Sequence, residues 1–480
     1  MNTTISSDGR ATTHPNLILG ICCLSLLMVA MDATIVNVAL PAIRRDLGAS
    51  ISGLQWVIDA YTMVVASLLM LAGSMADRFG RRRVFQSGMA LFMLGSLLCS
   101  LAPNIYGLAA FRVVQALGAT MLNPVAMSII ANTFYEPKAR ARAIGIWGAV
   151  AGVSMALGPV IGGALTESVG WRSIFWVNLP VGAAAMLLAA RYIPESRAPK
   201  PRRVDPIGQL LVFAILATVT YAVIEGPHAG WGSTTIIGLF AIAVFALITL
   251  LVYEPRRHDP LIDVRFFRSA PFSSATVIAV CSFSAFSGFL FLNTLYLQGV
   301  RGLSAFQTGL CTLPLAAATI LCSPLSGRLV GTYGTRPSLL AAGVATIISA
   351  VMMTQLTATT SLPWLLLTYV IFGIGFGMVN APITNTAVSG MPKAQAGLAA
   401  AVASTSRQVG ASLGVALAGT ILGSHMHDGF AEASHPFWWL MTGGGATIVL
   451  LAWLSNTGWA RDTTRHAAHL MEEAPAGAPA

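Results

Sequence analysis

The sequence predicts an all-α integral membrane protein, and three observations support this fold class. Apolar residues make up 55% of the 480-residue chain, charged residues only 10%, and the mean hydropathy is +0.72. These values do not fit a soluble protein. Apolar runs of about 20 residues, the length of a helix that crosses a ~30 Å hydrocarbon core, recur along the whole chain. The polar segments between them are too short to form a soluble domain.

Fourteen of these runs are expected to be transmembrane helices. The first run carries Asp32 and is too long for a signal peptide, so we expect it to be retained as a span. The runs begin near Asn16, Leu54, Val84, Asn104, Ala143, Ser173, Pro206, Thr234, Pro271, Thr308, Pro337, Leu362, Ala396 and Pro436.

Basic residues indicate the orientation of the chain. An even number of spans places both termini on one side, and most of the 28 lysines and arginines fall in segments on that side. The positive-inside rule therefore predicts a multi-pass protein of the cell membrane with both termini in the cytoplasm. Because the charge is spread over short loops, the pI of about 9.7 does not predict nucleic-acid binding.

Cysteine and histidine give no sign of a metal or redox site. All six cysteines fall inside apolar runs without a CxxC spacing, and we interpret them as small core residues. His425, His427, Asp428 and His435 lie in the last outer loop, where histidines usually bind no metal. We therefore expect no metal ion.

Glycine, proline and basic residues of the first half of the chain recur at a nearly constant offset in the second half, which indicates duplication of a six-span bundle. The matched pairs are Gly73 and Gly327, Gly80 and Gly334, Arg82 and Arg336, Lys138 and Lys393, and Pro124 and Pro382. This pairing leaves two additional spans in the middle, bounded by charged, proline-rich linkers. The predicted divisions are a tail at 1–15, a bundle at 16–203, the two extra spans at 204–258, a second bundle at 259–457 and a tail at 458–480.

Two acidic residues, Asp32 and Asp59, lie well inside predicted spans, where an ionised side chain costs at least ~2.5–3.5 kcal/mol. Helical rise places both at the depth of Arg112, roughly 8–12 Å below the outer boundary. Burial favours the protonated carboxyl and a nearby guanidinium favours the carboxylate, so movement of Arg112 relative to Asp32 would load and release a proton. The alternative is a permanent ion pair that joins two spans.

Five polar residues are candidate substrate contacts. For Asp59 we consider cation recognition or a hydrated position at the outer mouth. Asn37, Asn293 and Asn380 are amides within spans, where an unpaired polar group is costly, so they should face the protein interior. They either line a substrate path or bond helix to helix. Tyr61 completes this set.

Two glycine-containing segments are candidates for conformational gating. In the fifth span, Gly158, Pro159, Gly162 and Gly163 combine close helix contact with a bend, because Pro159 cannot donate to the carbonyl of Met155. The second segment is a basic loop at 73–83 that anchors the topology. Its acidic residue would bind a helix N-terminus or an arginine across the bundle and so hold one face closed. Its gating residues are Gly73, Asp77, Arg78, Gly80, Arg81 and Arg82.

These motifs together resemble the major facilitator superfamily, and specifically its fourteen-span drug:proton antiporter branch, the QacA/EmrB-like proteins. The similar segments are 32–41, 73–82, 112–119, 158–163, 171–180 and 296–304. Ala116 departs from the glycine of the family pattern in the fourth span. The tenth span lacks the acid that exporters of divalent cations carry there, which favours monovalent or neutral substrates.

The resemblance implies two six-helix bundles plus two central helices. It also implies export from the cytoplasm, by alternating access, of amphipathic drugs or antibiotics or of similar small hydrophobic or monocationic compounds. Protonation of Asp32 would drive the cycle, so that the proton motive force replaces any cofactor or ATP. The expected partners are a small-molecule substrate, protons and membrane lipids, and the carrier is expected to be a monomer. Alternatives are a proton-coupled importer of a small organic solute, or an exporter of a lipid, siderophore or endogenous metabolite. An enzyme is not expected.

Overall fold

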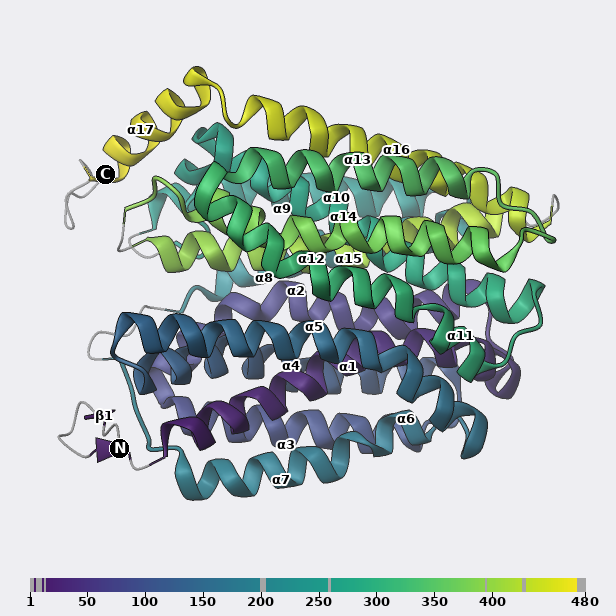
Figure 1. Cartoon of the computed structure of the whole chain (residues 1–480), viewed down its shortest axis with the longest axis horizontal. Coiled ribbons are helices and arrows are strands. Elements are labelled where there is room, and N and C mark those ends of the chain that lie inside the picture. The colour runs from purple at the N-terminus through teal and green to yellow at the C-terminus, as the bar shows by residue number, and fades with distance from the viewer. Residues whose placement is uncertain are drawn as a thin grey trace. The chain divides into compact units, whose positions relative to one another are not determined.

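The computed structural model describes residues 4–5, 11–12, 14–198, 204–257, 260–392, 395–424 and 429–472, and it is helical almost throughout (Figure 1). Two short strands, β1 (Thr4–Ile5) and β2 (Ala11–Thr12), pair antiparallel near the N-terminus. The long helices are α1 (Pro15–Leu47), α2 (Ile51–Phe79), α3 (Arg81–Ser100), α4 (Ile105–Thr133), α5 (Pro137–Ser168), α7 (Asn178–Tyr192), α8 (Pro206–Ala229), α9 (Thr234–Tyr253), α10 (Ala270–Leu295), α12 (Leu313–Tyr333), α13 (Thr335–Met353), α14 (Leu362–Val388), α15 (Ala396–Ser424), α16 (Phe430–Leu454) and α17 (Gly458–Glu472).

Among the described residues, thirteen helices are long and apolar enough to cross a membrane, and they coincide with thirteen of the fourteen predicted spans. The predicted thirteenth span forms a 29-residue helix, α15, but is not among them. Its middle carries the polar run Ser404-Thr-Ser-Arg-Gln408, which lowers its hydropathy. The expected all-helical membrane fold is therefore confirmed, whereas a count of fourteen spans stays a prediction.

The helices form two compact units. Unit 1 comprises Met1–Val204 and Leu303–Leu310, and unit 2 comprises Asp205–Gly302 and Cys311–Ala480. The two additional spans, α8 and α9, thus belong to unit 2, where the Thr420 hydroxyl of α15 donates to the carbonyl of Val223 on α8 at 2.6 Å.

The predicted loop at 73–83 is helical except at one residue, which corrects that expectation. Helix α2 continues to Phe79 and α3 begins at Arg81, so Gly80 alone makes the turn with φ of 110°. A positive φ of this kind is readily adopted only by glycine. Its predicted counterpart Gly334 also has a positive φ, 80°, between α12 and α13. The two halves of the chain therefore share this turn geometry.

Small residues allow the helices within each unit to pack closely, as is common in membranes. A Cβ on Gly95 of α3 would lie 2.4 Å from the backbone of Gln115 on α4. In unit 2, Gly343 of α13 and Gly445 of α16 face each other in the same way. Without side chains at these points, the backbones of neighbouring helices come into direct contact.

Several predicted spans are interrupted in the structure. The sixth begins with a short helix, α6 (Ser173–Trp176), before α7 starts at Asn178. The ninth ends in a π-helical turn, η3 (Tyr296–Val300), and the tenth is divided into α11 (Ala305–Cys311) and α12. Irregular backbone inside membrane helices often marks functional positions.

A further helix occupies part of the predicted C-terminal tail. In α17, the hydroxyl of Thr463 accepts a hydrogen bond from the backbone amide of Ala270, the first residue of α10, at 3.0 Å. Thr464 pairs with Ser269 at 3.0 Å. These contacts satisfy polar groups at the start of a spanning helix, where intrahelical partners are lacking. The segment around α17 therefore belongs to the folded part of unit 2.

Candidate functional site

Asp32 of α1 and Arg112 of α4 form an ion pair in the interior of unit 1. The Nη1 atom of Arg112 lies 2.6 Å from the Oδ2 atom of Asp32. Both residues are almost fully buried, at 0% and 1% exposure. The structure therefore brings together the two residues that the sequence predicted to share a depth. Removal of one partner of a buried ion pair destabilises the folded protein where the other charge is left uncompensated.

Two amides complete the surroundings of the Asp32 carboxylate. Gln115 donates from Nε2 to Oδ1 at 2.8 Å, and Asn178 donates from Nδ2 to the same oxygen at 3.2 Å. Gln115 lies one turn after Arg112 on α4, and its Oε1 accepts from Arg112 Nη1 at 2.7 Å. Asn178 is the first residue of α7, so the break between α6 and α7 places it here. The centre thus joins three helices.

A serine on α3 links these amides to the rest of the bundle. The Ser96 hydroxyl accepts hydrogen bonds from Asn178 at 3.0 Å and from Gln115 at 3.4 Å, and it donates to the carbonyl of Phe175 at 2.9 Å. Ser96 follows Gly95, whose missing side chain lets α3 approach α4. The sequence reasoning did not identify Gln115, Asn178 or Ser96 as ligands of this centre. Their position as polar residues near the depth of Asp32 was the available signal.

Arg112 has partners besides Asp32. Its Nε donates to the carbonyl of Val57 at 3.1 Å, and its Cζ lies 4.1 Å from the centroid of the Tyr61 ring, both on α2. A guanidinium over an aromatic face is stabilised by a cation–π interaction. Tyr61, predicted as a substrate contact, is buried and covers Arg112 in this conformation. These contacts hold Arg112 in place independently of the carboxylate.

Asp59 lies on α2 two residues after Val57 and is fully buried. Its Oδ1 accepts a hydrogen bond from the Thr62 hydroxyl one turn later, at 3.3 Å. Full burial does not fit the hydrated position at the outer mouth that the sequence left open. Cation recognition by Asp59 stays a prediction.

The three predicted asparagines have different surroundings. Asn37 is buried in unit 1, and its Nδ2 donates to the carbonyl of Ala33 at 3.3 Å while its Oδ1 has no partner among the described residues. In unit 2, Asn293 accepts from the Tyr369 hydroxyl at 2.6 Å, which bonds α10 to α14. Asn380 is half-buried on α14. Asn293 therefore bonds helix to helix, whereas substrate contact by Asn37 and Asn380 stays a prediction.

The turn at Gly80 is bound to the segment that follows α7. Asp77 forms an ion pair with Arg81 at 2.9 Å, and its backbone carbonyl accepts from the amide of Ala198 at 3.1 Å. Asp77 therefore pairs with an arginine across the adjacent turn and not across the bundle as predicted, and its role in gating stays a prediction. The start of α3 is bound instead by Glu195, whose carboxylate accepts from the backbone amides of Arg82 and Arg83 at 3.1 and 3.2 Å.

The remaining basic residues of this turn have weaker contacts. Arg82 donates from Nη1 to the carbonyl of Ile193 at 3.4 Å, and the Arg78 guanidinium lies 5.7 Å from the ring centroid of its neighbour Phe79. A Cβ on Gly80 would lie 2.5 Å from Oε1 of Glu195, whereas a Cβ on Gly73 would contact nothing within 4 Å. Only Gly80 is thus required by the local packing.

The glycines of α5 pack against the turn of α1 that carries Asp32. A Cβ on Gly158 would lie 2.0 Å from the Thr34 hydroxyl, and a Cβ on Gly162 would lie 2.6 Å from the Ile35 side chain. On another face of α5, a Cβ on Gly163 would lie 2.4 Å from the carbonyl of Ala305 in α11. The predicted close helix contact is therefore confirmed, and two different neighbours use it.

Pro159 leaves the carbonyl of Met155 without an intrahelical donor, as expected. The Thr34 hydroxyl of α1 takes that place and donates to this carbonyl at 3.3 Å. The same hydroxyl lies 3.2 Å from the carbonyl of Met31 in its own helix. Thr34 is two residues from Asp32, so the proline of α5 is connected directly to the helix turn that carries the buried carboxylate.

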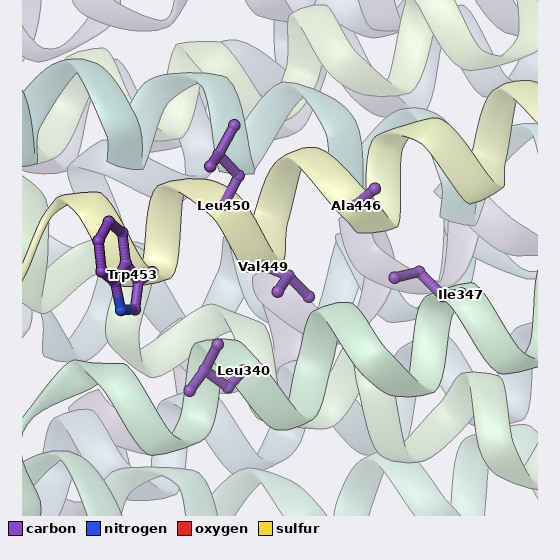
Figure 2. Close-up of a pocket in the computed structure, with 6 residues that line it drawn as sticks. All are labelled: Leu340, Ile347, Ala446, Val449, Leu450 and Trp453. Carbon is purple, nitrogen blue, oxygen red and sulfur yellow. The ribbon is translucent and has the colours of Figure 1, made fainter.

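An apolar groove of about 540 Å³ lies on unit 2 between α13 and α16 (Figure 2). Its lining residues are Leu340, Ile347, Ala446, Val449, Leu450 and Trp453. None of these side chains titrates, so the groove offers no group for proton coupling.

Among the described residues, no three His, Cys, Asp or Glu side chains are close enough to hold a metal ion. Of the histidine cluster in the last outer loop, His425, His427 and Asp428 lie outside the described residues. His435 forms a hydrogen bond to the carbonyl of Leu356 at 2.8 Å. All six cysteines are free.

Comparison with known proteins identifies a matching family model and several similar chains. A family model described as the Major Facilitator Superfamily matches residues 22–415. Multidrug resistance protein Stp of Mycobacterium tuberculosis is 39% identical over 83% of the chain and 74% of its own length. The tetracenomycin C resistance and export protein of Streptomyces glaucescens is 36% identical over 86% of the chain and 77% of its own length. The methylenomycin A resistance protein of Bacillus subtilis is 34% identical over 90% of the chain and 92% of its own length.

Proposed function

This chain belongs to the major facilitator superfamily and is a transporter rather than an enzyme, and from that membership we propose that it exports amphipathic drugs or antibiotics from the cytoplasm in exchange for protons. The names of its relatives support export of such compounds. The buried Asp32–Arg112 pair is the observation on which proton coupling depends. No other ion pair among the described residues has both side chains so completely buried.

The contacts of Arg112 favour proton coupling over a purely structural ion pair. If Asp32 takes up a proton, Arg112 loses its negative partner but keeps Gln115, the Val57 carbonyl and the Tyr61 ring. The cation is therefore not left without partners in a low-dielectric interior, which is the usual reason that opening a buried pair is costly. Asp32 can thus change charge while the surrounding helices stay folded.

The proposed cycle is alternating access. Substrate enters from the cytoplasm or the inner leaflet while Asp32 is ionised and paired with Arg112. Protonation of Asp32 from outside weakens the attachment of α1 to α4 and resets the carrier. A membrane potential supplies about 2.3 kcal/mol per charge per 100 mV, so one or two protons suffice for a tenfold or larger gradient without ATP or a cofactor.

The proposal includes a membrane topology. Fourteen spans with both termini in the cytoplasm follow if α15 crosses the membrane together with the thirteen apolar helices. Because Asp32, Arg112 and the α5 glycines all belong to unit 1, one copy of the chain contains the whole centre, which supports function as a monomer in the cell membrane.

Asp32→Asn tests the coupling directly. Purified carrier is reconstituted into sealed vesicles, a pH gradient is imposed, and uphill movement of a fluorescent amphipathic dye is recorded. Wild-type protein is expected to move the dye against its gradient, and Asp32→Asn is expected to lose this movement while it still folds and inserts into the membrane. Unchanged uphill export by the variant would contradict the role of Asp32. Flux in the direction of the proton would instead identify a proton-coupled importer, the alternative function.

A further inference from the structure

A second arginine, Arg407, lies inside a helix of unit 2 and has no role in the proposed proton pathway. It belongs to α15, about 16 Å along the helix from Ala396 at 1.5 Å per residue. It is half-buried and lies in the polar run that lowers the hydropathy of this helix. An arginine inside a membrane helix is costly and usually marks a substrate or ion pathway.

Helix packing fixes the depth of Arg407. Gly410 of α15 lies against Val280 of α10, where an added Cβ would come within 2.5 Å of its carbonyl, and Gly414 lies in the same way against Ser284. Helices α10 and α15 therefore run parallel, and the contact at Val280 is in the middle of a span. Arg407 is less than one turn from this contact, so its Cα lies well below the membrane surface.

Among the described residues, the Arg407 guanidinium donates to two hydroxyl groups. Nη2 donates to the Thr384 hydroxyl of α14 at 2.5 Å, and Nη1 donates to the Ser404 hydroxyl one turn earlier on α15 at 3.3 Å. The Nε atom is buried and has no hydrogen-bond partner among the described residues. Within that part of the chain, no carboxylate lies within ion-pair distance of Arg407.

The contrast with Arg112 shows what is missing. Arg112 has a carboxylate at 2.6 Å, and its Nε is satisfied by a carbonyl at 3.1 Å. Arg407 has neither. A guanidinium presents Nε–H and Nη–H in a planar fork that matches the two oxygens of a carboxylate, and such bidentate, charge-assisted bonds are among the strongest in proteins. The unfilled requirements at Arg407 are those that one anionic group would satisfy.

We propose that Arg407 binds an acidic group of the exported compound, such as a carboxylate or an ionised phenol. This inference rests on the proposed export function and names the class of cargo. Thr384 accepts from Arg407 and donates to the backbone carbonyl of Asn380 at 3.3 Å, so the guanidinium is held toward α14 near a predicted substrate contact. The carrier should therefore prefer amphipathic acids to neutral or cationic compounds of the same body, which differs from the neutral or monocationic cargo that the sequence favoured.

Three probes with one apolar body test this preference: pyrenebutyrate, pyrenebutanol and pyrenebutyl-trimethylammonium. Their binding to the purified full-length carrier in detergent is followed by fluorescence at neutral pH, where the carboxyl is ionised. The wild type is expected to bind the acid at least about tenfold more tightly than the alcohol. Arg407→Gln is expected to remove this preference, while Arg407→Lys keeps only part of it, because the charge remains but the planar fork is lost.

Asp32→Asn tests the proposed function separately, because it should abolish uphill transport while Arg407 and its contacts remain. Loss of the preference in Arg407→Gln with intact transport of the alcohol supports the proposal. Equal weakening of all three probes, or a wild type without preference, overturns it whether or not the variants fold. Displacement of pyrenebutyrate by phosphatidylglycerol alone would assign the site to lipid and also overturn it. Uphill transport by Asp32→Asn would contradict the proton-coupled function and leave the charge preference as a separate result.

Discussion

At the scale of single residues, the centre of unit 1 is the Asp32 carboxylate, which accepts hydrogen bonds from three side chains. Arg112, Gln115 and Asn178 all donate to Asp32, and Gln115 also accepts from Arg112. Gln115 therefore contacts both charges of the pair and keeps them in one geometry. A residue in this position stabilises the ionised state of the centre without carrying charge itself.

Replacement of Gln115 by methionine, which has a similar volume, removes both of these hydrogen bonds. Each buried partner left unsatisfied costs about 1–3 kcal/mol, so we expect a melting temperature several degrees lower and slower export. The measurement is thermal unfolding in detergent together with dye flux in vesicles. Gln115→Glu gives a comparison of the same shape, and a methionine variant with wild-type stability and flux would contradict the importance of this bridge.

The sequence was sufficient to predict the charged members of this site and insufficient for the neutral ones. Asp32 and Arg112 were identifiable because a charge in a span is costly and needs a reason. Gln115 and Asn178 are amides, whose cost in a span is smaller and has many solutions. Their convergence on one carboxylate depends on the close approach of α3 to α4 and on the break before α7, which no local pattern encodes.

At the scale of elements, α5 is the helix that brings the glycine motif to the buried carboxylate. Gly158 and Gly162 lie against Thr34 and Ile35, in the turns of α5 that follow the Met155 carbonyl to which Thr34 donates. A side chain at these glycines would push α5 away from α1. The motif therefore contacts the turn that holds Asp32, and its role in gating stays a prediction.

Gly158→Ala tests this contact, with Gly148→Ala on the same helix as its control. The first places a methyl group 2.0 Å from the Thr34 hydroxyl and 3.0 Å from a backbone carbonyl, and the second meets nothing within 4 Å. Overpacking of this kind costs about 1–3 kcal/mol, so Gly158→Ala should lower both the melting temperature and the rate of export. Equal behaviour of the two variants would show that α1 and α5 are not in contact as described.

The turn between α2 and α3 is the second element with a steric requirement. Alanine at Gly80 would have to adopt a φ of 110° and would crowd the Glu195 carboxylate. We expect Gly80→Ala to lose about 1–3 kcal/mol of stability, measured by thermal unfolding. Gly73→Ala should lose none, because Gly73 is helical and unobstructed and alanine favours a helix. A stable Gly80→Ala protein would argue against this geometry.

Glu195 shows what the sequence did not indicate at this scale. It follows α7 in a stretch expected as a linker, far along the chain from α3, yet its carboxylate binds the first amides of α3. An acidic side chain at a helix N-terminus is stabilised by the helix dipole and by the free N–H groups. Sequence reasoning assigned that kind of role to Asp77, because Asp77 is adjacent in the chain, and the fold assigned it to a distant residue.

At the scale of the whole molecule, composition predicted the fold class, and hydropathy located thirteen of the spanning helices. The recurrence of glycines in the two halves was also informative, since Gly80 and its predicted counterpart Gly334 both have a positive φ. The apolar pattern predicted a thirteenth span at α15, but the polar run that contains Arg407 leaves this helix outside the set recognised by length and apolar composition, although it packs along α10.

Reporter fusions test the topology. A reporter that is active only in the cytoplasm is inserted between α14 and α15, between α15 and α16, and after α17. We expect activity at the first and third positions and none at the second, because α15 crosses the membrane and both termini are cytoplasmic. Identical activity at the first two positions would show that α15 does not cross and that the carrier has thirteen spans.

The hydroxyl of Thr34 has one hydrogen to give and two carbonyl oxygens within reach, at 3.2 Å in its own helix and 3.3 Å in α5. Such a hydroxyl can exchange acceptors by rotation about a single bond. Movement of α1 along α5 would therefore not leave the hydroxyl without a hydrogen-bond partner. The proline thus provides a second acceptor for this hydroxyl beside the carboxylate. A threonine-to-valine change would keep the shape of the side chain and remove the exchangeable hydrogen bond.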